Sequence, residues 1–220
     1  MRKHRKHLFL KGVLIIFVIV TICGFNKKWK MIGYKYASLE NGWNLILVNQ
    51  YNHIPENYKI ELTELSNGKQ VDERICDSLE EMILAAESEN IYLVVVEAYR
   101  TEEEQSYIMN EKVNEYIQKG YPEFMAEIKA EKWVAEPGTS EHQLGIAVDI
   151  NPDYNRSDRN QVYTWLADNS YKYGFIYRYP EDKVHITGIS NEPWHYRYVG
   201  DEAAEEIFKN DICLEEYLKW

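Results

Sequence analysis

The chain of 220 residues contains little cysteine, and its few cysteines are scattered. Of the three, Cys23 falls in a hydrophobic segment, which leaves Cys76 and Cys213 in the remainder. Both lie in contexts typical of helices. In an exported protein they could pair, but two separate buried thiols fit equally well. Neither is near the histidine motifs described below, so we expect no cysteine among the metal ligands.

Residues 1–30 contain no aspartate or glutamate, whereas the rest of the chain has few basic residues. The first segment has eight Lys or Arg, so +8 of the overall charge of −11 lies there and residues 31–220 carry −19. Binding to nucleic acid relies on neutralising phosphates with Lys and Arg. Nucleic acid is therefore not an expected partner. The chain also lacks an internal repeat, and its length fits one domain with a proper core.

Only one long hydrophobic run is present, over residues 8–25, and it is broken by Lys11. A spanning helix needs about 20 mostly apolar residues, so this run is short, although Lys11 can snorkel to the interface. No Ala-x-Ala cleavage site follows. A lipoprotein site at Cys23 would need a small residue before it, and Ile22 is bulky. An uncleaved signal anchor is favoured over a cleaved signal.

The segments flanking this run complete the expected organisation. Residues 1–7 form a basic cytoplasmic tail, residues 8–25 a signal anchor, residues 26–69 a tether with the first strands, and residues 70–220 the main folded domain. Four basic residues precede the anchor and three follow it closely. The positive-inside rule therefore favours an inside amino terminus only weakly.

Hydrophobic patterns predict helices and strands that do not alternate regularly, which favours an α+β fold with an antiparallel or mixed sheet flanked by helices. Thr101 and Glu104 form an expected capping box for a helix that runs to about Gln118. Other helices are expected over residues 72–89, 122–135, 160–173 and 201–209. Strands are expected over residues 45–48, 58–65, 91–96, 145–150, 175–179 and 194–199.

Two stretches carry most of the candidate chemistry. Residues 137–150 contain His142 and Asp149, seven positions apart, and residues 192–198 contain Glu192 and His195. Together they offer two imidazoles and one carboxylate as metal ligands, with a second carboxylate to spare. A catalytic zinc site uses three such protein ligands and leaves a fourth position for water.

The spacing of these residues fits that chemistry. Asp149 lies in an expected buried strand, His142 in a turn that leads into it, and His195 at the start of another strand. Pro193 fixes the backbone and holds Glu192 close to the ligands but out of line with them. Two neutral imidazoles and one carboxylate leave a Zn²⁺ site net positive, which lowers the pKa of bound water toward ~7. Glu192 is then expected to act as the general base rather than as a ligand.

Three motifs resemble one known family. The patterns Ser140-x-His142-x-x-Gly145-x-Ala147-x-Asp149 and Glu192-x-Trp194-His195-x-Arg197-Tyr198 are similar to those of the zinc D-alanyl-D-alanine carboxypeptidases of the VanY type. The upstream Tyr99-Arg100-Thr101-x-x-x-Gln105 resembles the third motif of that family. The resemblance spans roughly residues 70–200. It implies the same α+β fold, which Hedgehog-like domains share.

The resemblance also implies roles for three further residues. Arg100 would stabilise the oxyanion that develops on the scissile carbonyl. Ser140 and Gln105 match positions that help to hold substrate, with capping and packing roles equally open. Where the family usually has Ser-Gly before Tyr-Arg, this chain has Glu97-Ala98, so a carboxylate beside Arg100 could pair with it and alter substrate preference.

The activity implied is a membrane-anchored zinc D,D-carboxypeptidase that removes the C-terminal D-alanine from peptidoglycan precursor stems, which would support glycopeptide resistance. An L,D-carboxypeptidase acting on tetrapeptide stems remains open, because related enzymes share the motifs. So does a non-catalytic zinc-containing cell-wall binding module, although such a module would not need Glu192. His53 and His185, outside the motifs, are interpreted as structural or exposed. The expected localisation is the cell membrane, single-pass, with the domain extracytoplasmic; the oligomeric state stays open.

Overall fold

The computed structural model describes residues 35–220. The basic tail and the signal anchor predicted over residues 1–25 lie outside the described residues. Tyr36–Trp220 form one compact unit, which agrees with the prediction of a single folded domain. Within residues 35–220, no helix has the length and apolar character that a membrane crossing requires.

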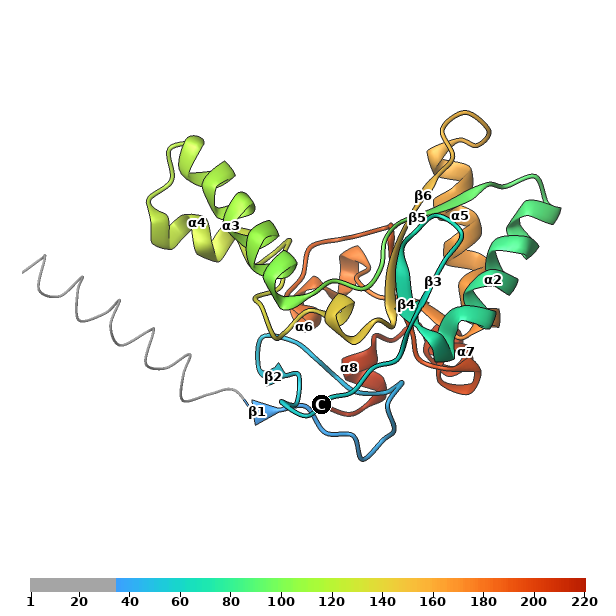
Figure 1. The fold of residues 1–220 in the computed structure, drawn as a ribbon, viewed down its shortest axis with the longest axis horizontal. Helices are drawn as coiled ribbons and strands as arrows, with labels where there is room; N and C mark the ends of the chain where they lie inside the picture. Colours follow the sequence, from blue (N-terminus) through green and yellow to red (C-terminus); the bar gives the residue numbers. More distant parts are fainter. Residues whose placement is uncertain (1–34) are drawn as a thin grey trace, which may run out of the picture. The chain divides into compact units, whose positions relative to one another are not determined.

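A four-stranded antiparallel sheet lies at the centre of the unit (Figure 1). Its strand order is β5 (Leu93–Glu97), β6 (Ala147–Pro152), β8 (His195–Tyr198) and β7 (Phe175–Tyr177). In the middle of the sheet, β6 places Asp149 opposite Glu97 of β5 on one side and His195 of β8 on the other. The prediction of an antiparallel or mixed sheet is thereby confirmed.

The sheet has two faces because side chains alternate along each strand. On β6, Val148 and Ile150 are fully buried in the main core, whereas Asp149 between them points to the opposite face. Helices α2 (Glu73–Ser88) and α5 (Arg159–Asn169) lie on the core side of the strands (Figure 1). Their apolar residues join Val148 and Ile150 in one cluster. The opposite face is therefore the one that can carry polar chemistry.

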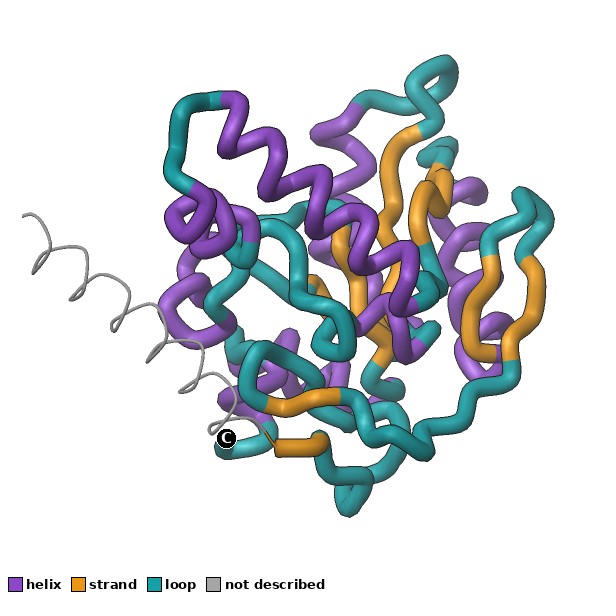
Figure 2. Tube along the Cα trace, turned by 60° about the vertical axis from the view of Figure 1, so that its left-hand side comes forward, coloured by secondary structure: helices purple, strands orange, loops and turns teal. Residues whose placement is uncertain are grey.

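Helix α3 (Glu102–Gln118) begins as the sequence predicts, with Thr101 and Glu104 forming a capping box. Helix α4 (Glu123–Ala130) starts where expected but ends earlier than residue 135, because residues 131–133 form a turn. The two helices pack against each other and project from the sheet as a hairpin (Figures 1 and 2).

The remaining elements are short. Two further pairs of strands form small sheets: β1 (Lys35–Tyr36) with β2 (Asn52–His53), and β3 (Leu62–Glu64) with β4 (Gln70–Asp72). The short helices are η1 (Glu141–Leu144), η2 (Ser170–Tyr173), η3 (Glu181–Lys183), α6 (Val184–Thr187), α7 (Asp201–Asn210) and α8 (Leu214–Tyr217).

Two of the predicted strands are corrected by the structure. Residues 45–48 are buried but irregular, because the Arg197 guanidinium donates hydrogen bonds to the carbonyls of Asn44 and Ile46, at 3.0 and 2.9 Å. A side chain thus satisfies backbone groups that a neighbouring strand would otherwise pair. Of residues 58–65, only Leu62–Glu64 form a strand.

Cys76 and Cys213 are both free thiols, so the interpretation as two separate cysteines is confirmed. Cys76 lies half-buried on α2, and Cys213 is buried just before α8. Burial raises the pKa of the Cys213 thiol to about 11. That thiol therefore stays protonated and unreactive at neutral pH.

Candidate metal centre

The three predicted ligands come together on the polar face of the sheet. One ligand atom each from His142, Asp149 and His195 lies within 4.8 Å of the others. Oδ1 of Asp149 is 3.0 Å from Nδ1 of His195 and 3.4 Å from Nε2 of His142. Two imidazole nitrogens and one carboxylate oxygen around a single point are a donor set that suits Zn²⁺.

His142 is held by the turn that precedes β6. It lies on η1, which ends at Gly145 with φ 69°. A Cβ added to Gly145 would lie 2.3 Å from Cδ1 of Ile60 and 3.0 Å from the backbone nitrogen of Asp72, so only glycine fits there. His142 Nδ1 donates to the carbonyl of Ala98 at 2.8 Å, which leaves Nε2 free to face Asp149.

The protonation of the ligands follows from their neighbours. Burial alone would raise the pKa of Asp149, but His142 and His195 outweigh it and hold that pKa far below its usual range. Burial alone would lower the pKa of His195, but the carboxylates of Asp149 and Glu141 raise it to about 9. The metal-free site therefore holds a protonated His195 at neutral pH, and a cation must displace that proton.

Glu192 lies beside this cluster and is only 8% exposed. Its Oε2 is 4.0 Å from Nδ1 of His195. The backbone N–H of His195 donates to the Glu192 carbonyl at 3.0 Å, which closes a tight turn with Pro193 at its second position. Burial raises the pKa of the Glu192 carboxyl to about 7, with His195 opposing the rise and Asp149 adding to it.

Arg100 is positioned by two neighbours. Its Nη1 donates to Oε1 of Gln105 at 2.7 Å, and its Nη2 lies 3.4 Å from Oε2 of Glu97. Glu97 therefore forms the ion pair with Arg100 that the sequence predicts. Nζ of Lys69 also lies 3.3 Å from Oε1 of Glu97. Within residues 35–220 the buried Nε of Arg100 makes no hydrogen bond.

The two other predicted substrate residues differ in what they offer. Gln105 is 1% exposed, and while its oxygen accepts from Arg100, its amide nitrogen donates to the Ala135 carbonyl at 2.6 Å. Both ends of its amide are therefore engaged. Ser140 is 4% exposed and immediately precedes η1, two residues before His142.

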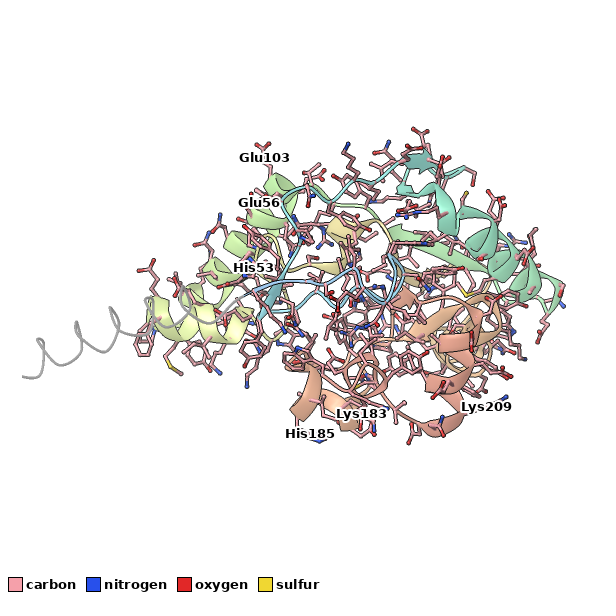
Figure 3. All side chains as sticks on the ribbon, turned by 90° about the horizontal axis from the view of Figure 1, so that it is seen from below. His53, Glu56, Glu103, Lys183, His185 and Lys209 are labelled. Atoms are coloured by element: carbon pink, nitrogen blue, oxygen red, sulfur yellow. The ribbon has the colours of Figure 1, made fainter. Side chains whose placement is uncertain are left out.

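Among residues 35–220, the two histidines outside the motifs do not join the cluster. His53 lies partly buried on β2, and His185 is exposed on α6 (Figure 3). This placement agrees with their interpretation as structural or exposed residues.

Sequence reasoning missed Glu141, which is 2% exposed. Its Oε1 accepts from Nε of Arg178 at 2.8 Å and from Nη1 of Arg197 at 2.9 Å, while its Oε2 lies 3.4 Å from Nε2 of His195. Burial alone would raise the pKa of Glu141, but the two arginines hold it well below its usual range. A glutamate next to a candidate ligand in a buried segment was the available signal.

A cavity of about 490 Å³ opens beside Asp149 on the polar face of the sheet. Its floor includes residues of β5 and β6, and aromatic side chains and one arginine line its walls. The lining residues are Val96, Asp149, Asn151, Tyr154, Arg159, Tyr163, Pro193 and Trp194. The candidate ligand Asp149 is therefore reached from a cavity with both apolar and hydrogen-bonding surfaces.

Comparisons with known proteins identify related carboxypeptidases. A D-alanyl-D-alanine carboxypeptidase of Enterococcus faecalis (strain ATCC 700802 / V583) is 57% identical over 179 residues, which cover 81% of this chain and 67% of that relative. A solved structure of the LD-carboxypeptidase LdcB is 36% identical with a TM-score of 0.67, and the match covers 82% of this chain and 88% of that one.

Two further solved structures are matched over nearly their whole length. A mutant of the vancomycin resistance D,D-pentapeptidase VanY in complex with Zn(II) is 57% identical, with a TM-score of 0.78, covering 80% of this chain and 99% of that one. VanYB in complex with D-Alanine-D-Alanine is 57% identical, with a TM-score of 0.80, and the match covers 80% of this chain and 98% of that one. The family model described as VanY, D-alanyl-D-alanine carboxypeptidase, matches residues 68–201. The chain therefore belongs to the VanY family of D-alanyl-D-alanine carboxypeptidases.

Proposed function

We propose that the protein is a zinc D,D-carboxypeptidase that removes the C-terminal D-alanine from peptidoglycan stem peptides. The observation that carries the proposal is the cluster of His142, Asp149 and His195 with the buried carboxylate of Glu192 beside it. Membership of the VanY family and the likeness to a Zn(II) complex support the choice of metal and reaction. By this relationship the activity would support resistance to glycopeptides.

In this proposal His142, Asp149 and His195 hold the metal. A bound Zn²⁺ polarises the scissile carbonyl and makes the attacking water more acidic. Glu192 takes the proton of that water and delivers it to the leaving amine. Burial raises the pKa of the Glu192 carboxyl in the metal-free protein, and a raised pKa favours acceptance of a proton from the water.

Arg100 is assigned to the oxyanion of the reacting carbonyl. Its guanidinium is held in place by Gln105 and Glu97, and it would supply positive charge and hydrogen bonds to that oxyanion. Gln105 acts through Arg100, since its own amide is fully engaged. Ser140, buried two residues before His142, contributes to holding the substrate near the ligands.

The cavity beside Asp149 is assigned to the part of the stem that precedes the scissile bond. The ligand Asp149 lines the cavity, and the backbone N–H of Arg100 donates to the carbonyl of the ligand His142 at 3.2 Å, so both adjoin the ligand cluster. A peptide can therefore place its last residue near Arg100 and run its preceding residues along the cavity. Asn151 and Trp194 offer that segment a polar and an aromatic contact.

An L,D-carboxypeptidase is the second candidate, because the 36% identical LdcB has that activity in its name. The Glu97–Arg100 ion pair changes the surroundings of the group that would contact the terminal residue, so it bears directly on this choice. The non-catalytic module is disfavoured, since it gives no reason to keep Glu192 buried beside a complete ligand set.

Mass spectrometry of stems incubated with the purified protein tests the function. Pentapeptide stems ending in D-alanyl-D-alanine should lose one D-alanine, and tetrapeptide stems should remain intact. Cleavage of the tetrapeptide alone would establish the L,D activity instead. If both stems survive with zinc-loaded protein, the chain is a binding module.

Zinc affinity should increase with pH. Because the pKa of His195 is raised to about 9 in the metal-free protein, zinc must displace one proton below that pH, so affinity rises about tenfold per pH unit. The same protonated histidine stabilises the metal-free fold fully below its unfolded pKa of 6.5, and that contribution is lost as the pH rises through about 9. Chelator competition at several pH values measures the first effect; an affinity independent of pH would contradict the assignment of His195.

We further propose that residues 8–25 anchor the protein in the cell membrane, with the folded domain outside. The support is an apolar run without a small-residue cleavage site in a family that acts on cell-wall precursors. Amino-terminal sequencing of protein from its native membrane should find the segment retained. A mature terminus beyond Phe25 would show instead that it is a cleaved signal.

A further inference from the structure

We infer that Glu141 is a positioning residue that fixes the tautomer and the orientation of His195, so that its Nδ1 faces the metal. This inference rests on the proposed zinc site and adds to it a residue that takes no part in holding metal or substrate. Glu141 precedes the ligand His142 directly, but its carboxylate serves the other histidine of the site.

The two ring nitrogens of His195 have different partners. Nδ1 lies 3.0 Å from Oδ1 of Asp149, within the ligand cluster, whereas Nε2 lies 3.4 Å from Oε2 of Glu141. An ionised carboxylate can only accept hydrogen bonds, so Glu141 keeps the proton on Nε2 and leaves the lone pair on Nδ1. Metal-binding histidines commonly donate the N–H of their other ring nitrogen to a carboxylate in this way.

Glu141 is itself fixed by charges. Its second oxygen, Oε1, accepts hydrogen bonds from both Arg178 and Arg197, so the carboxylate cannot rotate away from His195 without breaking them. Arg178 in turn makes two hydrogen bonds with Glu215, at 2.8 and 2.7 Å. The four side chains are each at most 2% exposed and carry two positive and two negative charges, which balance.

This arrangement predicts what an isosteric change would do. In Glu141→Gln, the amide oxygen stays with the two arginines, because both are obligatory donors. The amide nitrogen then faces Nε2 of His195, which must become an acceptor. The proton moves to Nδ1, the nitrogen that faces Asp149, and blocks the lone pair that would bind metal.

The test is zinc affinity of the full-length protein, measured by competition with a chelator. Glu141→Gln should bind zinc about 10- to 100-fold more weakly than wild type, the usual cost of losing the partner behind a metal-binding histidine. Nitrogen-15 NMR of the zinc-loaded proteins supplies a second readout. Wild type should show a proton on Nε2 of His195 that is protected from exchange by its carboxylate acceptor, and in Glu141→Gln, which lacks that acceptor, the same proton should exchange faster.

Glu215→Gln is the matched control, because Glu215 binds the same arginine at the same depth without contacting His195. It should melt earlier than wild type but keep wild-type zinc affinity. Should Glu141→Gln not fold, Glu141→Asp keeps the charge while shortening the reach to His195, and it too should bind zinc weakly.

Three results would overturn the inference. One is a folded Glu141 variant that binds zinc within threefold of wild type, about 0.7 kcal/mol. Another is a Glu215→Gln variant that loses as much zinc affinity as Glu141→Gln, because the effect would then belong to the whole buried ion-pair network. The third is an Nε2 proton of His195 that exchanges as slowly in Glu141→Gln as in wild type. A wild-type protein that binds no zinc would instead contradict the proposed function. Failure of the proposed function can therefore be told apart from failure of this inference.

Discussion

Glu192→Gln is expected to lower kcat by about 100- to 10,000-fold, because a positioned general base contributes that much and an amide cannot take a proton. The change preserves shape, so zinc content and melting temperature should match wild type. Steady-state kinetics on pentapeptide stems measure the loss, and elemental analysis of the same sample measures the metal.

Asp149→Asn provides the contrast, since it should lose zinc and activity together. In wild type, kcat/KM should fall as the pH drops through the pKa of Glu192, which burial raises to about 7 in the metal-free protein. A bound cation lowers that midpoint, because it favours the carboxylate. If Glu192→Gln loses zinc as Asp149→Asn does, the two roles are misassigned. Activity within a few-fold of wild type would mean that another group is the base.

Arg178→Met is expected to lower the free energy of unfolding by about 3–5 kcal/mol. Arg178 is 1% exposed and pairs with both Glu141 and Glu215, so its removal leaves two buried carboxylates with one arginine. Total stability is about 5–15 kcal/mol, and the melting temperature should fall by roughly 6–20 °C. Differential scanning calorimetry measures both.

Two further variants serve as controls for the stability loss in Arg178→Met. Lys209→Met removes an exposed partner of Glu205 on the surface of α7 (Figure 3) and should leave the melting temperature nearly unchanged. Arg178→Met/Glu215→Met leaves Glu141 paired with Arg197, so it should recover part of the loss. A single Arg178→Met variant as stable as Lys209→Met would show that the buried network contributes little.

Local signals predicted most of the fold. The capping box at Thr101 and Glu104 marks the start of α3 correctly, because it involves only neighbouring residues. Residues 45–48 were predicted as a strand from their apolar character, yet a guanidinium from Arg197 replaces the partner strand. Such a contact joins residues about 150 positions apart and leaves no local pattern. Burial could thus be predicted there, whereas hydrogen-bonding partners could not.

In the candidate site, too, some features could be predicted from the sequence and others could not. The residue types and spacing of His142, Asp149 and His195 predicted a cluster, and the structure brings them together. The roles of Glu141 and Gln105 depend on which partners fold against them, and neither role is visible in spacing. The position of Glu141 beside a candidate ligand hinted at burial, but its role became visible only when Arg178 and Arg197 were found to converge on it.

The register of the central sheet gives zinc content a second use, as a measure of correct folding. Asp149 and His195 are direct partners across β6 and β8. Because side chains alternate, a slip of one residue between these strands would turn His195 to the core face and leave the site one donor short. A refolded sample that takes up less than one zinc per chain would therefore report the fraction of molecules trapped in the slipped pairing, even where circular dichroism shows full strand content.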